Sequence, residues 1–339
     1  MRRQSRRSFL KRAGCLGAAS ALARVLREPS AAYADYSPTT VPALGSRPST
    51  GPIDESAKSI VADIRAEQVF DGQKLHERLL GEMVELGLQI VTGSATASDA
   101  WNKLLGGDEV IGLKFNHVGA GKIETTIPLA RQLVQSLGRA GFAPERIVLI
   151  EVPGHLEAAL QTKRRVFGWS GGKVHFGSGR EELAAVLEEI TAIVNVPFLK
   201  THNIAGMTGC LKNLSHALVR RPGRYHAHAC TPYVGDIVAL PQICLKLRVH
   251  IVNAVRAVFT GGPAARLAGM WPHRGILVSK DPVAADSVGL DIIDEQRSRA
   301  GLAPIGDANA HVPHVSHAAR RGLGTDDQDY IRLVRPQVL

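Results

Sequence analysis

Cysteine and aromatic residues are scarce in this sequence of 339 residues. Only four residues are cysteine, and Phe, Trp and Tyr together make up 5% of the chain. No two cysteines form a Cys-x-x-Cys pair, and we therefore expect no self-contained iron–sulfur cluster, which needs four thiolates. Three cysteines, Cys210, Cys230 and Cys244, follow the N-terminal segment, and the sequence leaves their disulfide state open.

Long hydrophobic runs are also missing. The weakly apolar run at residues 13–26 is interrupted by Arg24 and is shorter than the roughly 20 residues that span a bilayer, so we expect no stable membrane span. A complete dinucleotide fingerprint is absent as well. Gly119 and Gly121 match half of it, but Glu124 stands at the third glycine position, which argues against a nicotinamide cofactor.

The excess of positive charge is concentrated at the N-terminus. The chain has 41 Lys and Arg against 31 Asp and Glu, but residues 1–34 hold eight of the basic residues and only one of the acidic ones. The rest of the chain therefore carries a net charge of only +3. Because this charge is too small for an electrostatic footprint on a polyanion, we expect no nucleic-acid partner.

The N-terminal segment has the features of a twin-arginine export signal in the right order. Arg6-Arg7 precedes Phe9-Leu10-Lys11, a stretch rich in Ala and Gly follows, and Ala32-Tyr33-Ala34 has the small-x-small pattern of a cleavage site. We predict a signal peptide at 1–34, a linker at 35–52 and a single α/β domain at 53–339. The predicted partner is the twin-arginine (Tat) export machinery, and the predicted location is periplasmic or extracellular.

Amphipathic segments alternate with short apolar runs beyond residue 53, which is typical of parallel strands joined by crossover helices. We predict an α/β fold with a mostly parallel sheet and helices on both faces. This is a three-layer sandwich, built as one body or as two lobes. The predicted strands are 110–115, 146–152, 173–176, 192–198, 249–255 and 275–278. The predicted helices are 74–89, 97–105, 126–138, 155–166, 181–189, 207–218, 235–247 and 282–299.

The segment from Lys200 to Leu214 is the first candidate site. It follows the strand 192–198, at the edge where open parallel sheets place their ligands. Backbone N–H groups at the start of the next helix predict an anion cradle, and His202 is the candidate for proton transfer because imidazole titrates near neutral pH. The alternative is a capped helix with two surface lysines. The candidate residues are Lys200, His202, Thr208, Gly209, Lys212 and Asn213.

Two further segments are expected to reach the same cleft. Lys114 and Asn116 stand at the end of the neighbouring strand 110–115 and would contribute to ligand binding. Asp281 and Asp286 begin the helix that follows strand 275–278. Asp281 is well placed to cap that helix, whereas Asp286 is either a second structural carboxylate or a general base in the cleft.

A histidine-rich segment is the candidate metal site. If residues 226–230 are extended, His226, His228 and Cys230 project from one face, because side chains alternate along a strand. Imidazole and thiolate together suit zinc or another late transition metal. Since loop histidines are usually solvated, a plain surface loop is the alternative.

Four blocks of sequence together resemble the domain of unknown function 362 family. The similar region spans about residues 110–293. Some members of that family are fused to ferredoxin-like iron–sulfur modules. For this chain, the resemblance therefore implies redox chemistry and a redox partner protein. This chain departs from the family in lacking the ferredoxin cysteine set and in having Asn253 where the family pattern has Asp. The blocks are Gly112-Leu113-Lys114-Phe115-Asn116, Asn195-Val196-Pro197-Phe198-Leu199-Lys200-Thr201-His202, Thr208-Gly209-Cys210-Leu211-Lys212-Asn213-Leu214 and Ser279-Lys280-Asp281-Pro282-Val283-Ala284-Ala285-Asp286.

The sequence therefore predicts an exported α/β protein with a basic, enzyme-like cleft for an anionic small molecule. A metal ion or a redox cofactor would fit this interpretation, and the sequence does not choose between them. The alternative is a non-catalytic periplasmic module that binds a ligand or a protein partner through the same cleft. The substrate and the oligomeric state stay open.

Overall fold

The computed structural model describes residues 58–305 and 312–336. The predicted signal peptide (1–34) and linker (35–52) lie outside these residues, so both stay predictions. Within the described part of the chain, no helix is both long enough and apolar enough to cross a membrane.

The described residues form one large mixed sheet in which most strand pairs are parallel. The central strand β11 pairs in parallel with β8 and β9 and antiparallel with β13, while β4 pairs in parallel with β5 and β8. The strand order is β14-β1-β13-β11-β8-β4-β5. These strands are β1 (Ser59–Arg65), β4 (Ile111–Lys114), β5 (Ile147–Ile150), β8 (Ala192–Asn195), β9 (Phe198–His202), β11 (Leu247–Val258), β13 (Gly275–Ser279) and β14 (Ile331–Val334).

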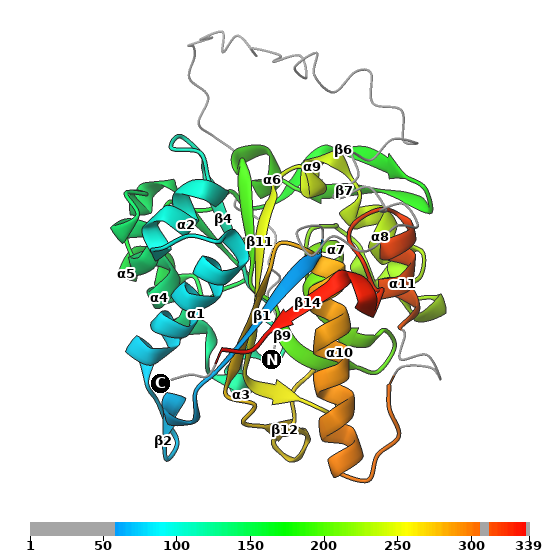
Figure 1. Cartoon of the computed structure of the whole chain (residues 1–339). Helices are drawn as coiled ribbons and strands as arrows, with labels where there is room; N and C mark the ends of the chain where they lie inside the picture. The colour runs from blue at the N-terminus through cyan, green and yellow to red at the C-terminus, as the bar shows by residue number, and fades with distance from the viewer. Residues whose placement is uncertain (1–57, 306–311, 337–339) are drawn as a thin grey trace, which may run out of the picture. The chain divides into compact units, whose positions relative to one another are not determined.

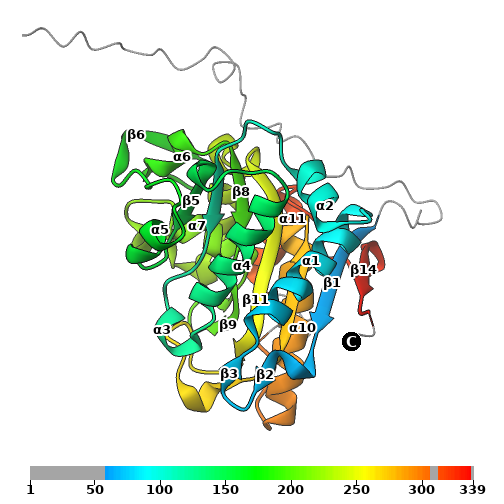
Figure 2. The ribbon, with the colours of Figure 1, turned by 90° about the vertical axis from the view of Figure 1, so that its left-hand side faces the viewer.

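Helices cover both faces of this sheet because its strands are apolar on both sides (Figures 1 and 2). In β13, Leu277 packs into one hydrophobic core while Ile276 and Val278 pack into the other. This arrangement confirms the predicted α/β three-layer sandwich. One layer holds α1 (Glu77–Thr92), α2 (Ala97–Leu104) and α4 (Thr126–Arg139); the other holds α7 (Cys210–His216), α8 (Tyr233–Val238), α10 (Pro282–Arg299) and α11 (Pro313–Arg320).

The strand predicted at 192–198 is two strands. It breaks at Val196-Pro197, and β8 and β9 pair one after the other with the same strand β11. Proline lacks an N–H, so it interrupts the ladder at this point. β9 then turns into the antiparallel strand β10 (Gly206–Thr208), which leads directly into α7. Because of this break, Lys200 and His202 belong to β9 and lie beyond the end of β8.

Two other predictions were wrong in ways that tertiary contacts explain. The helix predicted at 181–189 is the end of a hairpin, followed by a single helical turn. Glu181 is fully buried and pairs with Arg221 and Arg224, partners that no local pattern reveals. The helix predicted at 235–247 is split at Pro241. The remaining short elements are β2 (Phe70–Asp71), β3 (Lys74–Leu75), α3 (Ala120–Ile123), α5 (His155–Ala159), β6 (Trp169–Phe176), β7 (Gly179–Ala184), α6 (Val186–Glu189), α9 (Pro241–Cys244) and β12 (Met270–Trp271).

Helix α10 has the predicted bounds, and Asp281 is its N-cap. One carboxylate oxygen accepts hydrogen bonds from the N–H groups of Val283 (2.8 Å) and Ala284 (2.9 Å). The other oxygen accepts from Ser59 Oγ (2.7 Å) and from the N–H of Thr325 (3.0 Å). A single side chain thus ties the helix start to strand β1 and to the C-terminal region.

We expect Asp281→Ala to lower the free energy of unfolding by about 2 kcal/mol or more, because it leaves four donors without their acceptor. Urea denaturation followed by circular dichroism would measure this change. Asp281→Asn retains one acceptor oxygen and should lose less. Equal losses in the two variants would contradict a capping role.

Candidate functional site

Four of the predicted site residues form one hydrogen-bonded group at the carboxyl edge of the sheet, which we call the polar network. Its members are Lys114, Asn116, Lys200 and Asn213. Asn213 Oδ1 accepts hydrogen bonds from Lys114 Nζ (3.1 Å) and Asn116 Nδ2 (2.9 Å). Lys200 Nζ donates to Asn116 Oδ1 (3.0 Å) and to the carbonyl of Val118. Side chains from β4, β9 and α7 therefore converge as the sequence predicted.

Asn213 holds this network in place through its other amide atom. Asn213 Nδ2 donates to Asn195 Oδ1 (2.7 Å) and to the carbonyl oxygen of Lys114 (3.2 Å). Asn195 in turn donates to the carbonyl of Cys210 and contacts the ring of His250. Both amides are buried, and a buried polar group is costly unless its hydrogen bonds are made. The network is therefore rigid before any ligand binds.

Glu151 belongs to the same region, and the sequence analysis missed it. It follows β5 directly, and its carboxylate contacts Lys114 Nζ (2.6 Å) and the ring of His117. Burial alone would raise the pKa of Glu151, but Lys114 and His117 together lower it to about 2. The sequence signal that could have identified Glu151 was a charged residue at the end of β5, the strand that pairs with β4. Glu151 neutralises Lys114, so Lys114 is a structural ion-pair partner more than a free cation.

Lys200 is buried without an ion pair to any carboxylate among the described residues. Burial lowers the pKa of this lysine to about 7. Glu151 raises the pKa, whereas Lys114 and Lys212 lower it further. Since the ammonium is destabilised by burial and by its positive neighbours, an incoming negative charge would stabilise it.

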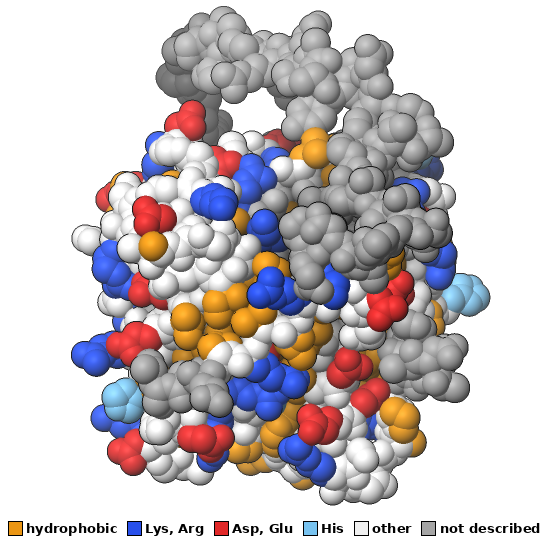
Figure 3. Space-filling view, viewed as in Figure 1, with side chains coloured by type: hydrophobic (Ala, Val, Ile, Leu, Met, Phe, Trp, Pro, Cys, Tyr) orange, Lys and Arg blue, Asp and Glu red, His pale blue; other side chains and the backbone are white. Residues whose placement is uncertain are grey.

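Lys212, in helix α7, is another buried lysine. It is 5% exposed, and its Nζ lies 3.4 Å from His226 Nε2, with no carboxylate contact in the part of the chain that the structure describes. Burial lowers the pKa of Lys212 to about 8. The alternative interpretation of Lys200 and Lys212 as surface lysines was wrong. On the face drawn in Figure 3, exposed Lys and Arg side chains are interspersed with acidic ones, whereas Lys200 and Lys212 are buried.

His202 stands beside these lysines but is held neutral. Burial, followed by the positive charge of Lys212, lowers its pKa to about 3. Its Nδ1 accepts hydrogen bonds from the N–H groups of Ile204 and Ala205, both at 3.2 Å. The proton is therefore on Nε2, and the ring is a hydrogen-bond donor to a ligand. This argues against the predicted role of His202 in proton transfer at neutral pH.

A cavity of about 450 Å³ opens at His202. None of the described residues that line it is acidic; Arg297 contributes a guanidinium, whose Nε lies 3.9 Å from Asp294 Oδ1 outside the lining. The guanidinium of Arg297 is positioned by the carbonyl oxygens of Ala303 (2.7 Å) and Phe259 (2.9 Å). The lysines are not among the lining residues, but the positive charges of Lys212 and Lys200 both lower the pKa of His202. The lining residues are Thr201, His202, Asn203, Ile204, Ala205, Gly206, Ala229, Thr260, Gly261, Gly262, Arg297, Ile305, Val312 and Pro313.

Asp286 occupies the anion cradle that the sequence predicted for a ligand. Its carboxylate accepts hydrogen bonds from the N–H groups of Cys210 (2.5 Å) and Leu211 (3.1 Å) at the start of α7. Burial raises the pKa of Asp286 to about 7. Thr208 does not cap the helix: the N-cap is Gly209, and Thr208 Oγ1 is buried without a partner among the described atoms. We therefore leave Asp286, Thr208 and Gly209 out of the ligand site.

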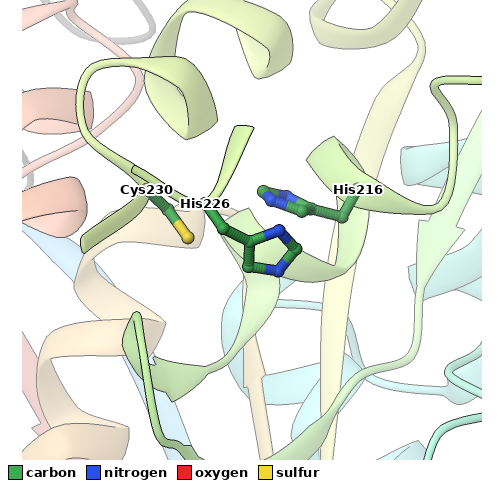
Figure 4. A group of neighbouring side chains, drawn as sticks. All are labelled: His216, His226 and Cys230. Carbon is green, nitrogen blue, oxygen red and sulfur yellow. The ribbon is translucent and has the colours of Figure 1, made fainter. Parts of the chain in front are cut away.

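The histidine-rich segment is not extended, contrary to the prediction. Residues 222–225 and 228–230 form short 3-10 helices, and His228 is exposed to solvent. His226 and Cys230 instead approach His216 of α7, with the three ligand atoms within 4.8 Å of one another (Figure 4). His216 was missed as a candidate ligand, although its spacing of four residues from Lys212 places both on one helix face.

Asn253, the position at which the chain departs from the family pattern, lies outside the polar network. It is buried, and its Nδ2 donates to Thr125 Oγ1 (2.9 Å) at the start of α4. Its Oδ1 has no partner among the described atoms. This residue therefore fixes a helix to the sheet, and among the described residues it forms no hydrogen bond with Lys200 or Lys212.

Comparison with known proteins gives one family match. No curated protein matches this chain. The family model covers residues 169–291, which include the sequence blocks around Lys200, Lys212 and Asp286. Lys114 and Asn116 lie before the matched region. Residues 169–291 match the family model described as Domain of unknown function (DUF362), and this match supports the family resemblance found in the sequence.

Proposed function

We propose that this protein binds an anionic small molecule in the cavity at His202, with Lys200 and Lys212 supplying positive charge from behind the ring. The observation that carries the proposal is the presence of two buried lysines without carboxylate partners, among the described residues, next to a cavity whose described lining holds no acid. Buried ammonium groups are unfavourable unless a negative charge compensates them, and a bound anion would do so.

The site residues have two proposed roles: some would contact the ligand, and others would hold those residues in position. His202 would donate from Nε2 to the ligand, and Arg297, which also lines the cavity, would add positive charge. Asn116, itself held by Asn213, would keep Lys200 in position. If the site transfers a proton, Lys200 is the better candidate than His202, because burial brings the pKa of this lysine to about 7.

A non-catalytic binding module remains the second candidate. It is favoured by the low pKa of His202, which leaves this residue a fixed hydrogen-bond donor at neutral pH. A binding protein needs only donors and charge, both of which the site supplies. Turnover of any bound anion would decide for an enzyme, and tight binding without turnover for the module.

We also propose that the chain is exported by the twin-arginine route to the periplasm or beyond. The proposal rests on Arg6-Arg7, the following apolar stretch and the Ala32-Tyr33-Ala34 pattern. Replacing the two arginines with lysine should leave the full-length chain in the cytoplasm, as measured by cell fractionation. Normal export of that variant would contradict the proposal.

The affinity for an anion should fall as pH rises through 7, because Lys200 loses its proton there. The groups that face Lys200 are Glu151, Lys114 and Lys212. Sulfate is a suitable probe since its own charge is constant between pH 6 and 9. We expect roughly tenfold weaker sulfate binding at pH 8.5 than at pH 6, measured by isothermal titration calorimetry.

Lys200→Met is the matched variant for this measurement. It should bind sulfate weakly at both pH values and show a smaller pH dependence, while circular dichroism confirms that it is folded. A wild-type affinity that is unchanged between pH 6 and 8.5, or a variant that binds as tightly as wild type, would contradict the role of Lys200.

A further inference from the structure

Three potential metal ligands converge beside the anion cavity, and none of them takes part in the proposed anion binding. His216 lies at the end of α7, His226 follows the 3-10 helix at residues 222–225, and Cys230 ends the 3-10 helix at residues 228–230. One ligand atom from each lies within 4.8 Å of the others. Figure 4 shows the ring of His226 between the sulfur of Cys230 and the ring of His216. We call these three residues the histidine–cysteine cluster.

The backbone around Cys230 is shaped to turn its sulfur inward. His228, Ala229 and Cys230 all have positive φ angles, of 52°, 53° and 66°, although none of them is glycine. Three successive left-handed residues are unfavourable, at about 1 kcal/mol or more each. The result is a fully buried Cys230 next to an exposed His228. Because of this turn, Cys230 faces the cluster and His228 does not, whereas alternation along a strand would have placed both on one face.

His216 is oriented as a metal-binding histidine usually is. Its Nε2 lies 3.1 Å from the carbonyl oxygen of Tyr225, which places the ring proton there and leaves Nδ1 with a lone pair. The hydroxyl of Ser215 lies 2.8 Å from Nδ1, but it also lies 3.2 Å from the carbonyl oxygen of Lys212. Ser215 therefore has a second acceptor and can release Nδ1 to a metal ion.

His226 likewise has backbone on one side of its ring. These backbone groups belong to Pro222 and Gly223. On the other side Nε2 faces Lys212 Nζ at 3.4 Å. A divalent ion at the cluster would repel this ammonium, so an anion in a fourth coordination position would lie between the two positive charges. The cluster adjoins the cavity, because Ala229 and His202 line the cavity and the ring of His202 stacks on that of His226 at 5.7 Å.

We propose that His216, His226 and Cys230 bind one late transition-metal ion, with zinc as the best match, and that its fourth coordination position is open toward Lys212. Two imidazoles and a thiolate suit zinc far better than magnesium or calcium, which prefer oxygen ligands. Ligand atoms around tetrahedral zinc are about 3.3 to 3.7 Å apart, so the cluster needs to contract by about 1 Å. The proposal does not depend on the identity of the anion.

The test uses the purified full-length protein and two ions, zinc and cobalt. We expect about one zinc per chain after dialysis against zinc, and in the cobalt form the absorption band of a thiolate-bound ion. Cys230→Ser and His226→Gln should weaken zinc binding by at least about 100-fold. The matched control is His228→Gln, which changes an exposed histidine two residues away and should bind zinc as wild type does.

Several results would overturn the proposal. These are less than one tenth of a zinc per chain in the wild type, a cobalt form without a thiolate band, or equal losses in His226→Gln and His228→Gln. If Cys230→Ser fails to fold, as circular dichroism would show, His226→Gln still decides because His226 is only half-buried. Lys200→Met should lose sulfate binding and keep zinc binding, so failure of the metal site and failure of the anion site are separate results.

Discussion

The double variant Lys200→Met/Lys212→Met is expected to bind sulfate at least about 100-fold more weakly than the wild type and to be more stable at pH 6. The loss of affinity follows from removing two positive charges, each of which contributes about 1.5 kcal/mol or more when it interacts with a buried anion. Isothermal titration calorimetry at pH 6 would measure the affinity. Thermal unfolding of the same samples without sulfate would measure the stability.

The gain in stability follows from the unfavourable burial of the lysines. A pKa that falls from 10.5 in the unfolded chain to about 7 in the folded protein means that the unfolded state holds the proton more tightly. For Lys200 the cost is roughly 5 kcal/mol below pH 7, and it disappears as pH rises from 7 to 10.5. Methionine keeps most of the side-chain volume without the charge. The advantage of the variant should therefore shrink between pH 7 and 10.5.

Lys114→Met is the control for this result, because Lys114 differs from the other two lysines in having a carboxylate partner. Its removal leaves the largely buried Glu151 with only the exposed ring of His117 as a partner and should destabilise the protein by about 3 kcal/mol. A double variant that is less stable than the wild type at pH 6, or that binds sulfate equally well, would mean that the two lysines have a structural role that the charges do not explain.

The convergence of the polar network could be predicted because it follows from sheet geometry alone. Lys114 ends one parallel strand and Lys200 follows the neighbouring one, and the carboxyl ends of parallel strands meet at one edge. The same rule would have found Glu151, which directly follows Ile150, the residue of β5 that pairs with Lys114. The sequence therefore held this information.

The protonation states and the metal ligands could not be predicted in the same way. The low pKa of His202 depends on its burial and on Lys212, and neither is visible in a pattern of residue types. Cys230 and His226 were identified, but on the basis of an extended chain that the left-handed turn at residues 228–230 replaces. His216 comes from another element and needed the packing of α7 against residues 222–225. Tertiary contacts decided each of these features.

The anion cradle is a further feature that only tertiary contacts could reveal. The sequence predicted a ligand there, but the cradle is filled by the carboxylate of Asp286. Asp286 comes from α10, more than 70 residues after the helix that it caps. It also explains why position 209 is glycine. A Cβ atom at Gly209 would lie 2.0 Å from Asp286 Oδ1, and the three closest atoms to it all belong to the Asp286 side chain. The two positions are therefore coupled energetically.

Gly209→Ala is expected to lower the free energy of unfolding by about 3 kcal/mol, since both the new methyl group and the buried carboxylate need the same space. Asp286→Ala should cost about 2 kcal/mol through the loss of two hydrogen bonds to Cys210 and Leu211. The double variant should cost no more than Asp286→Ala alone, because the methyl group then has room.

Urea denaturation of the four proteins completes this double-mutant cycle, and the expected coupling between the two positions is about 3 kcal/mol. Gly138→Ala is the control for replacing a glycine near a helix end. A Cβ atom at Gly138 meets nothing within 4 Å, so this change in α4 should stabilise the protein by about 0.5 kcal/mol. Additive costs in the cycle would mean that Asp286 is free to move away from α7. Its carboxylate would then be available to the cleft, and the anion cradle at the start of α7 would again be open to a ligand.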